Sequence, residues 1–147
     1  MSTQKVFWVE FTKMYDTHCH LNFRAFENDY HEIIKHSLEK GMFLNIVGTQ
    51  YETSRRAVQI AEEFMDSPVY ASVGLHPSHL EKSYDPAEGV KNVHAWSHEK
   101  YKQLWVHPKV AGIGETGIDM FRLPDDENAK NRVLEKQRDV FEEHIRL

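Results

Sequence analysis

The chain has 147 residues, and its 18 Lys and Arg against 23 Asp and Glu give a formal net charge of −5. That length suffices for one domain, and 40% hydrophobic with 28% charged residues excludes a disordered chain. No apolar stretch approaches the roughly 18–20 residues of a membrane span, and no signal-peptide pattern opens the sequence. A single cysteine excludes an intramolecular disulfide framework. We therefore expect a cytoplasmic protein without membrane contact, and the acidic balance excludes a broad basic surface for nucleic acid.

Short apolar runs alternate with longer amphipathic stretches along the whole sequence. The runs have the length of strands and lie at residues 14–20, 42–48, 69–75 and 110–115. Four helices are expected. The first covers about 28–40, and the second begins at a capping-box pattern formed by Thr49 and Glu52. The third lies around 96–105, and the fourth lies toward the end of the chain. The last of these has one helical face formed by Val133, Leu134, Gln137, Val140, Phe141, His144 and Ile145. Four apolar strands separated by helices predict an α/β fold with a parallel sheet.

Two closures of such a sheet are open from this pattern. One is an open doubly wound sheet, and the other is part of a (β/α)8 barrel, which typically needs about 250 residues. Four units amount to half of a barrel, with unpaired strand edges and an inward face, including Leu44 and Ile113, that lacks its opposite wall. We expect the isolated chain to aggregate, to self-associate, to pair with a second half, or to be a piece of a longer protein.

Ten histidines are an unusual number for this length, and they raise the question of metal ligands. Strand alternation places Asp16, His18 and His20 on one face of the first strand, while Cys19 points away. Two imidazoles at this spacing can reach one cation, although one of them could instead be a core histidine. The pair falls at the carboxyl end of a strand, where parallel α/β folds place their sites.

Further candidates follow the third and fourth strands. Glu115 is flanked by glycines that let its carboxylate approach a metal, with a solvated loop acid as the alternative. His76 ends the third strand before a proline and could contact a phosphate or carbonyl. Asp119 could orient a ligand and Arg122 could meet an anionic substrate, but both could be ordinary surface residues. His94 and His98 lack a third ligand and indicate a solvated helix face.

Three segments together resemble the TatD family of metal-dependent deoxyribonucleases. They are Asp16-Thr17-His18-Cys19-His20-Leu21, Val73-Gly74-Leu75-His76-Pro77 and Gly112-Ile113-Gly114-Glu115-Thr116-Gly117-Ile118-Asp119, and Gln137 and Phe141 also fit the family pattern. The resemblance covers residues 14–147 and leaves residues 1–13 as an N-terminal extension. It implies a TIM barrel of the amidohydrolase superfamily, of which this chain supplies about the first four βα units.

The resemblance also implies a site and an activity. His18 and His20 would bind one divalent ion, and Glu115 would bridge it to a second, with Mg²⁺, Mn²⁺ or Zn²⁺ as the ions. Asp16, His76, Asp119 and Arg122 would contact the substrate or orient the ligands. The implied reaction is hydrolysis of DNA phosphodiester bonds by an exonuclease, which removes nucleotides from a strand end.

This sequence departs from the family in one respect. The family's second half supplies two further histidine ligands and a catalytic aspartate, and none of the remaining histidines here lies in a matching motif. Two alternatives therefore stay open beside the deoxyribonuclease. One is an amidohydrolase acting on an amide or ester, and the other is a catalytically incompetent fragment that binds a metal or a partner.

Overall fold

The computed structural model describes residues 13–80, 86–89, 96–121 and 123–147. Arg122 and most of the predicted N-terminal extension lie outside these residues. The strands are β1 (Met14–Cys19), β2 (Met42–Val47), β3 (Val69–Val73) and β4 (Val110–Ile113). The helices are α1 (Tyr30–Glu39), α2 (Tyr51–Glu63), α3 (His98–Trp105) and α4 (Glu127–Ile145), with single 3-10 turns η1 (Arg24–Phe26) and η2 (Pro77–Leu80).

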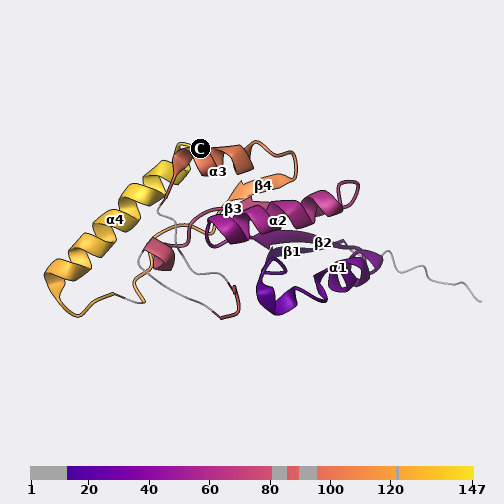
Figure 1. Cartoon of the computed structure of the whole chain (residues 1–147), viewed down its shortest axis with the longest axis horizontal. Helices are drawn as coiled ribbons and strands as arrows, with labels where there is room; N and C mark the ends of the chain where they lie inside the picture. The colour runs from indigo at the N-terminus through magenta and orange to yellow at the C-terminus, as the bar shows by residue number, and fades with distance from the viewer. Residues whose placement is uncertain (1–12, 81–85, 90–95, 122) are drawn as a thin grey trace, which may run out of the picture.

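The four strands form one parallel sheet in the order β1-β2-β3-β4 (Figure 1). Helices separate the strands along the chain, as the alternating pattern predicts. A doubly wound sheet reverses its strand order at a switch point, whereas successive barrel strands pair in sequence order. The uninterrupted order therefore corresponds to the first βα units of a TIM barrel, and the expected α/β fold is confirmed.

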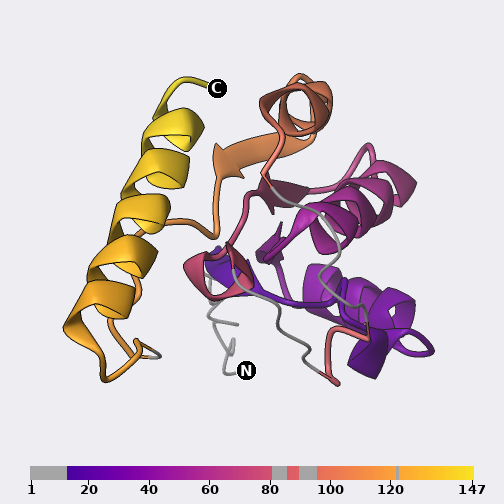
Figure 2. The same cartoon turned by 60° about the vertical axis from the view of Figure 1, so that its left-hand side comes forward.

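The hydrophobic core lies between the sheet and the helices α1, α2 and α3, which cover one of its faces (Figure 2). Leu44 is only 3% exposed and packs in this core together with Ile46 and Ile34. Its predicted place on the inward face is wrong, because β2 turns its even-numbered side chains toward the helices. On the inner face, Asn45 bonds instead to the Thr17 carbonyl and the Ser72 hydroxyl.

Helix α2 begins one residue later than the sequence pattern suggests. The capping box pairs Gln50 with Thr53, whose hydroxyl accepts the Gln50 backbone N–H at 3.0 Å, so the predicted pair of Thr49 and Glu52 is wrong. Glu52 instead bonds to Arg55, one turn further along the surface of the helix, at 3.0–3.1 Å. Thr49 and Glu52, like Gln50 and Thr53, are three residues apart, which is the spacing of a capping box. The second pair forms because the Thr53 hydroxyl also accepts the Thr49 N–H, at 2.9 Å, in the segment that leaves β2.

Helix α4 lies beyond the carboxyl ends of the strands (Figure 2), and its C-terminal part meets α3, where the Glu143 carboxylate lies 3.6 Å from Nδ1 of His98. Its apolar face is largely uncovered, with Phe141 38% and Ile145 70% exposed. The helix residues that are buried are both polar, Gln137 and His144. Periodicity therefore predicts this helix correctly but not what it packs against. In the described part of the chain, no helix has the length and apolarity needed to cross a membrane.

Candidate metal centre

Three side chains from two strand ends converge on one point. The Nε2 atom of His18 lies 3.1 Å from a carboxylate oxygen of Glu115 and 3.2 Å from Nε2 of His20. The ligand atoms of the three residues all lie within 4.8 Å of one another. His18 lies near the carboxyl end of β1 and Glu115 follows β4, so the fold itself creates this proximity. Imidazole and carboxylate donors at this spacing fit a divalent transition metal ion.

The orientation of His20 is fixed by its surroundings. Its Nδ1 lies 3.0 Å from the Val47 carbonyl, and since a carbonyl only accepts, Nδ1 carries the proton. The Nε2 lone pair is then free to face His18 and Glu115. The ring also stacks on Phe23, with the centroids 4.4 Å apart and the planes 16° from parallel. Hydrogen bonding of the distal nitrogen to a carbonyl is a common way to orient a metal-binding imidazole.

Glu115 is held by backbone contacts between neighbouring strand ends. Its N–H donates to the Gly48 carbonyl after β2 at 2.9 Å, and the preceding Gly114 N–H donates to Val73 in β3 at 2.9 Å. A Cβ atom on Gly74 would lie 2.6 Å from the Gly114 carbonyl carbon, well inside contact distance. Gly74 is thus needed for the chain after β4 to approach β3 closely and present Glu115.

Asp16 does not follow the strict alternation predicted for β1. The pairing with β2 shifts between Asp16, which is opposite Leu44, and Cys19, which is opposite Ile46. Leu44 and Ile46 both face the helices, so Asp16 and Cys19 lie on the helix side of β1. Asp16 therefore does not share a face with His18, although strict alternation predicts that it does. The Asp16 carboxylate accepts the His18 backbone N–H at 3.1 Å and so orders the strand beside the cluster.

Cys19 points away from the cluster, as alternation predicts. Its thiol donates to the Asn45 carbonyl at 3.4 Å. Burial, with a smaller contribution from Asp16, raises the pKa of Cys19 to about 11. A thiol that stays protonated in the core is a poor metal ligand.

His76 and Asp119 flank the cluster without joining it. The His76 N–H donates to the Thr49 carbonyl at 2.7 Å, and its ring bonds to the Ser78 hydroxyl at 2.8 Å. Burial lowers the pKa of His76 and outweighs the opposing attraction of Glu115. The Asp119 carboxylate accepts the Phe121 N–H at 2.8 Å. Arg122 lies outside the described residues.

A buried polar network that the sequence does not predict surrounds the Glu88 carboxylate. Glu88 accepts from the Thr49 hydroxyl at 2.9 Å, from the Gln50 amide, and lies 2.9 Å from Nε2 of His79. Burial raises the pKa of Glu88, but the hydrogen bonds from His79, Gln50 and Thr49 outweigh it and hold the pKa below its usual range. Because the partners are far apart in sequence, no local motif marks them.

Parallel βα units with imidazole and carboxylate groups gathered at the strand ends define the barrel class of metal-dependent hydrolases. The family model described as "TatD related DNase" matches residues 15–147. The chain belongs to this family.

Three relatives illustrate the similarity. The chain is 33% identical over 135 residues to the uncharacterized metal-dependent hydrolase YjjV of Escherichia coli (strain K12), covering 90% of this chain and 45% of the relative. It is 34% identical to the uncharacterized metal-dependent hydrolase YabD of Bacillus subtilis (strain 168), covering 72% and 37%. A 3'-5' ssDNA/RNA exonuclease TatD of Musicola paradisiaca (strain Ech703) is 31% identical, covering 74% and 38%. The chain thus spans less than half the length of these relatives.

Proposed function

We propose that this chain provides the metal-binding strand ends of a phosphodiesterase that hydrolyses DNA, removing nucleotides from a strand end. The observation that carries this proposal is the convergence of His18, His20 and Glu115 within 4.8 Å. Support for the substrate comes from relatives named as 3'-5' ssDNA/RNA exonucleases, although other relatives have no assigned substrate. We place the reaction in the cytoplasm.

Each side chain would have a distinct task. His18 and His20 would hold one divalent ion through Nε2, and Glu115 would bind it and reach toward a second. Such ions supply Lewis acidity at a phosphoryl oxygen and an activated water, and Mg²⁺, Mn²⁺ or Zn²⁺ suit these donors. His76, kept neutral by burial, would offer a hydrogen bond to the phosphate, while Asp16 and Asp119 order the backbone around the ligands.

The test uses a single-stranded DNA oligonucleotide labelled at one end. Release of mononucleotides with Mn²⁺, Mg²⁺ or Zn²⁺, and its loss on chelation, is the expected result. Glu115→Gln keeps the side-chain size but removes the charge, so it should abolish release. Cys19→Ser, which changes a neighbour that faces away, should retain it. Turnover that survives chelation, or that Glu115→Gln leaves intact, would contradict the proposal.

The same assay separates the two alternatives. An amide or ester hydrolase would cleave a chromogenic ester under metal dependence but leave the oligonucleotide intact. A fragment that binds metal without turnover would show a calorimetric metal signal dependent on His18 and His20, and no cleavage of either substrate. The three ligands gathered in the described residues favour retained metal binding in all three cases.

We further propose that additional βα units, in a second copy or a complementary half, complete the barrel. Large apolar side chains support this, since Tyr15 is 64%, Phe121 87% and Ile145 70% exposed. Gel filtration is expected to show association or aggregation. A monomer that melts cooperatively at high dilution would contradict this proposal without affecting the assignment of the metal ligands.

A further inference from the structure

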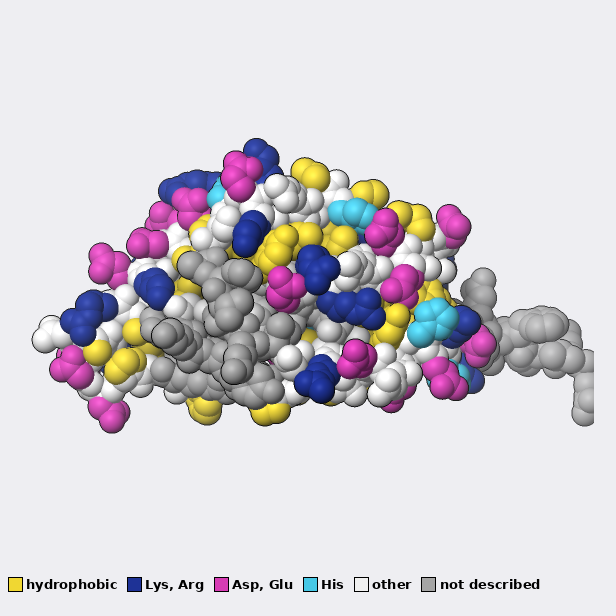
Figure 3. Space-filling view, in the orientation of Figure 1, with side chains coloured by type: hydrophobic (Ala, Val, Ile, Leu, Met, Phe, Trp, Pro, Cys, Tyr) yellow, Lys and Arg dark blue, Asp and Glu magenta, His cyan; other side chains and the backbone are white. Residues whose placement is uncertain are grey.

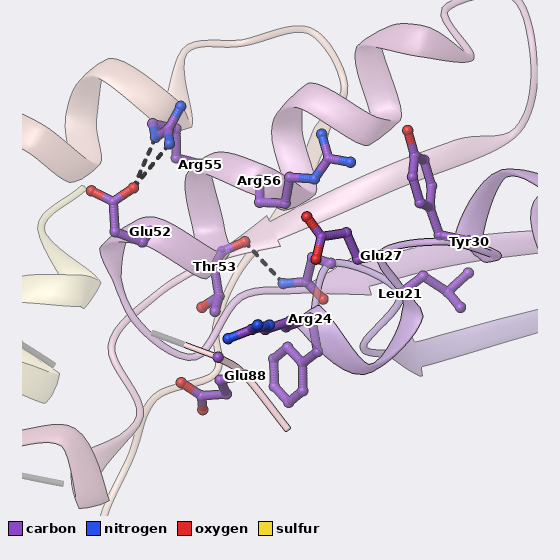
Figure 4. A pocket seen from close by; sticks show the side chains of 12 residues that line it. Leu21, Arg24, Glu27, Tyr30, Glu52, Thr53, Arg55, Arg56 and Glu88 are labelled. Atoms are coloured by element: carbon purple, nitrogen blue, oxygen red, sulfur yellow. Dashed lines mark hydrogen bonds and ion pairs between the residues drawn. The ribbon is translucent and has the colours of Figure 1, made fainter. Parts of the chain in front are cut away.

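A pocket of about 470 Å³ opens between the segment after β1 and helix α2 (Figure 4). Its walls come from the segment after β1, the first turn of α1, the exposed side of α2, and residues 88–89. Three arginines line it, Arg24 from η1 and Arg55 and Arg56 from α2, and the Arg55 side chain turns to Glu52 at the rim (Figure 4). Because these elements are far apart in sequence, the pocket is a product of the fold, and no sequence motif marks it.

The pocket and the metal centre share a wall. Phe23 lines the pocket, and the same ring stacks on His20 with the centroids 4.4 Å apart. The side-chain amide of Asn22, another lining residue, donates to the Val47 carbonyl at 3.0 Å, the atom that also orients His20. One aromatic ring therefore separates the pocket from a candidate ligand. Because a nucleic-acid strand carries a phosphate at every nucleotide, a strand held at the metal centre brings a neighbouring nucleotide to this shared wall.

The three arginines differ in how far their charge is already neutralised. Arg55 donates two hydrogen bonds to Glu52, at 3.0 and 3.1 Å. Arg56 lies 3.7 Å from Glu63 and packs over the Tyr30 ring at 4.9 Å.

Arg24 differs from both, because it forms no ion pair with any residue that the structure describes. Its charge is available to an anion in the pocket.

The position of Arg24 is set by its backbone and its aliphatic stem. Its N–H donates to the Glu88 carbonyl at 3.3 Å, and the next residue donates to Ala87 at 3.1 Å. A Cβ atom on Gly89 would lie 2.4 Å from Cδ of Arg24, so the arginine stem packs directly against this glycine. Holding the stem reduces the entropy lost when the guanidinium binds an anion.

We propose that this pocket binds the nucleotide next to the cleaved linkage of a nucleic-acid strand, with Arg24 donating to its phosphate. The inference rests on the proposed function, since it takes the substrate to be a nucleic acid. A planar guanidinium suits the two oxygens of a phosphate. Glu27, which lines the same pocket, has the opposite effect, because its carboxylate repels the phosphate and so limits how tightly the strand is held.

The binding test uses the full chain and a fluorescent single-stranded oligonucleotide, followed by anisotropy in a chelating buffer. Arg24→Gln should weaken binding about two- to five-fold, the range for one exposed charge pair. The plot of the logarithm of the binding constant against the logarithm of the salt concentration should become shallower by roughly 0.7. Glu27→Gln should strengthen binding by a similar factor. Arg146→Gln removes the same charge from the end of α4 and serves as the matched control, with no change expected beyond the general charge effect.

A second arm identifies the bound phosphate. An oligonucleotide with an uncharged methylphosphonate at the linkage next to the terminal one should bind wild type and Arg24→Gln equally. Inorganic phosphate should compete only weakly with the oligonucleotide, because it offers a single phosphate and none of the strand's other contacts. Equal effects of Arg24→Gln on the charged and the uncharged oligonucleotide, or none on either, would overturn the proposal.

The cleavage assay separates this inference from the proposed function. Binding that depends on Arg24, without cleavage under any metal, supports the pocket and contradicts the phosphodiesterase. Cleavage whose KM is the same in wild type and Arg24→Gln supports the phosphodiesterase and overturns the pocket. Absence of any measurable binding to the oligonucleotide overturns the pocket as well.

Discussion

His144 of α4 accepts a hydrogen bond at 3.0 Å from the backbone N–H of Leu75, although the two residues are 69 positions apart. The accepting atom is Nε2, and Nδ1 donates to the Val140 carbonyl at 2.7 Å within the helix. The ring is 1% exposed. This single neutral side chain ties α4 to the segment that leads from β3 into His76.

Because His144 must stay neutral to accept from Leu75, we predict an acid-sensitive stability. Burial lowers the pKa of His144, so the unfolded chain binds a proton at a higher pH than the folded chain. The free energy of unfolding should therefore fall as the pH drops below about 6.5, the usual histidine value, and level off below the folded pKa. Urea unfolding at several pH values measures this slope.

The matched variant is His144→Gln, whose amide oxygen can still accept from Leu75 but does not titrate. This variant should reduce the dependence of the free energy of unfolding on pH between pH 7 and 5. A smaller pH dependence should remain, because burial also lowers the pKa of His76. An unchanged slope in this variant would show that His144 is not the titrating group. His144→Ala removes the hydrogen bonds to Leu75 and Val140 and the 3.1 Å contact with the Thr116 hydroxyl, and should cost about 2–4 kcal/mol at pH 7.5.

Glu88 leads to a prediction at lower pH. Its carboxylate is 5% exposed and is a common acceptor for Thr49, Gln50 and His79. Since its pKa is held below the usual range, its contribution is present above about pH 4.3 and is lost as the pH falls through the folded pKa. Glu88→Ala should cost about 3–5 kcal/mol at pH 7, because three donors lose their partner.

Glu88→Gln is the control for charge, since it keeps one acceptor oxygen in place. It should cost less than Glu88→Ala at pH 7 and should unfold with a shallower pH dependence below pH 5. Equal losses in the two variants would mean that the network depends on charge rather than on the hydrogen bonds. Thermal unfolding at matched ionic strength gives both comparisons.

The sequence predicts the strands, the helices and the grouping of candidate ligands because these follow from local patterns. Apolar runs mark β1 to β4, and the parallel sheet then brings the ends of β1 and β4 to one side, where His18 meets Glu115. The position of Asp16 could not be predicted, because a register shift in β1 depends on how β2 pairs with it.

Contacts between distant segments are equally hidden from the sequence. Periodicity places Gln137 and His144 on an apolar helix face, yet the structure uses both to bond backbone groups, with Gln137 accepting the Asp119 N–H at 2.9 Å. The isolated positions of Glu88 and Arg24 carry no motif at all. What such residues do is decided by tertiary contacts rather than by spacing.

Cys19 provides a chemical check on the direction of the side chains in β1. With its pKa raised to about 11 by burial, the thiolate fraction at pH 8 should be about 100-fold smaller than for a thiol with pKa 9.0. Alkylation by iodoacetamide should be slower by at least that factor in the folded chain and should recover in urea. Rapid alkylation of the folded chain would mean that Cys19 is exposed beside His18 and His20.

Gly74 offers the sharpest test of how Glu115 is positioned. In Gly74→Ala the new Cβ would collide with the backbone at Gly114, so the segment after β4 must move outward and carry the Glu115 carboxylate with it. We expect a stability loss of about 1–3 kcal/mol, the range for overpacking, and a metal affinity at least ten-fold weaker by calorimetry. Ile60→Val, in the core of α2, should produce a loss of about 0.5–1.5 kcal/mol while leaving metal affinity unchanged. If both variants weaken metal binding in proportion to their stability loss, the effect is general loosening, and the close approach at Gly74 has no particular part in presenting Glu115.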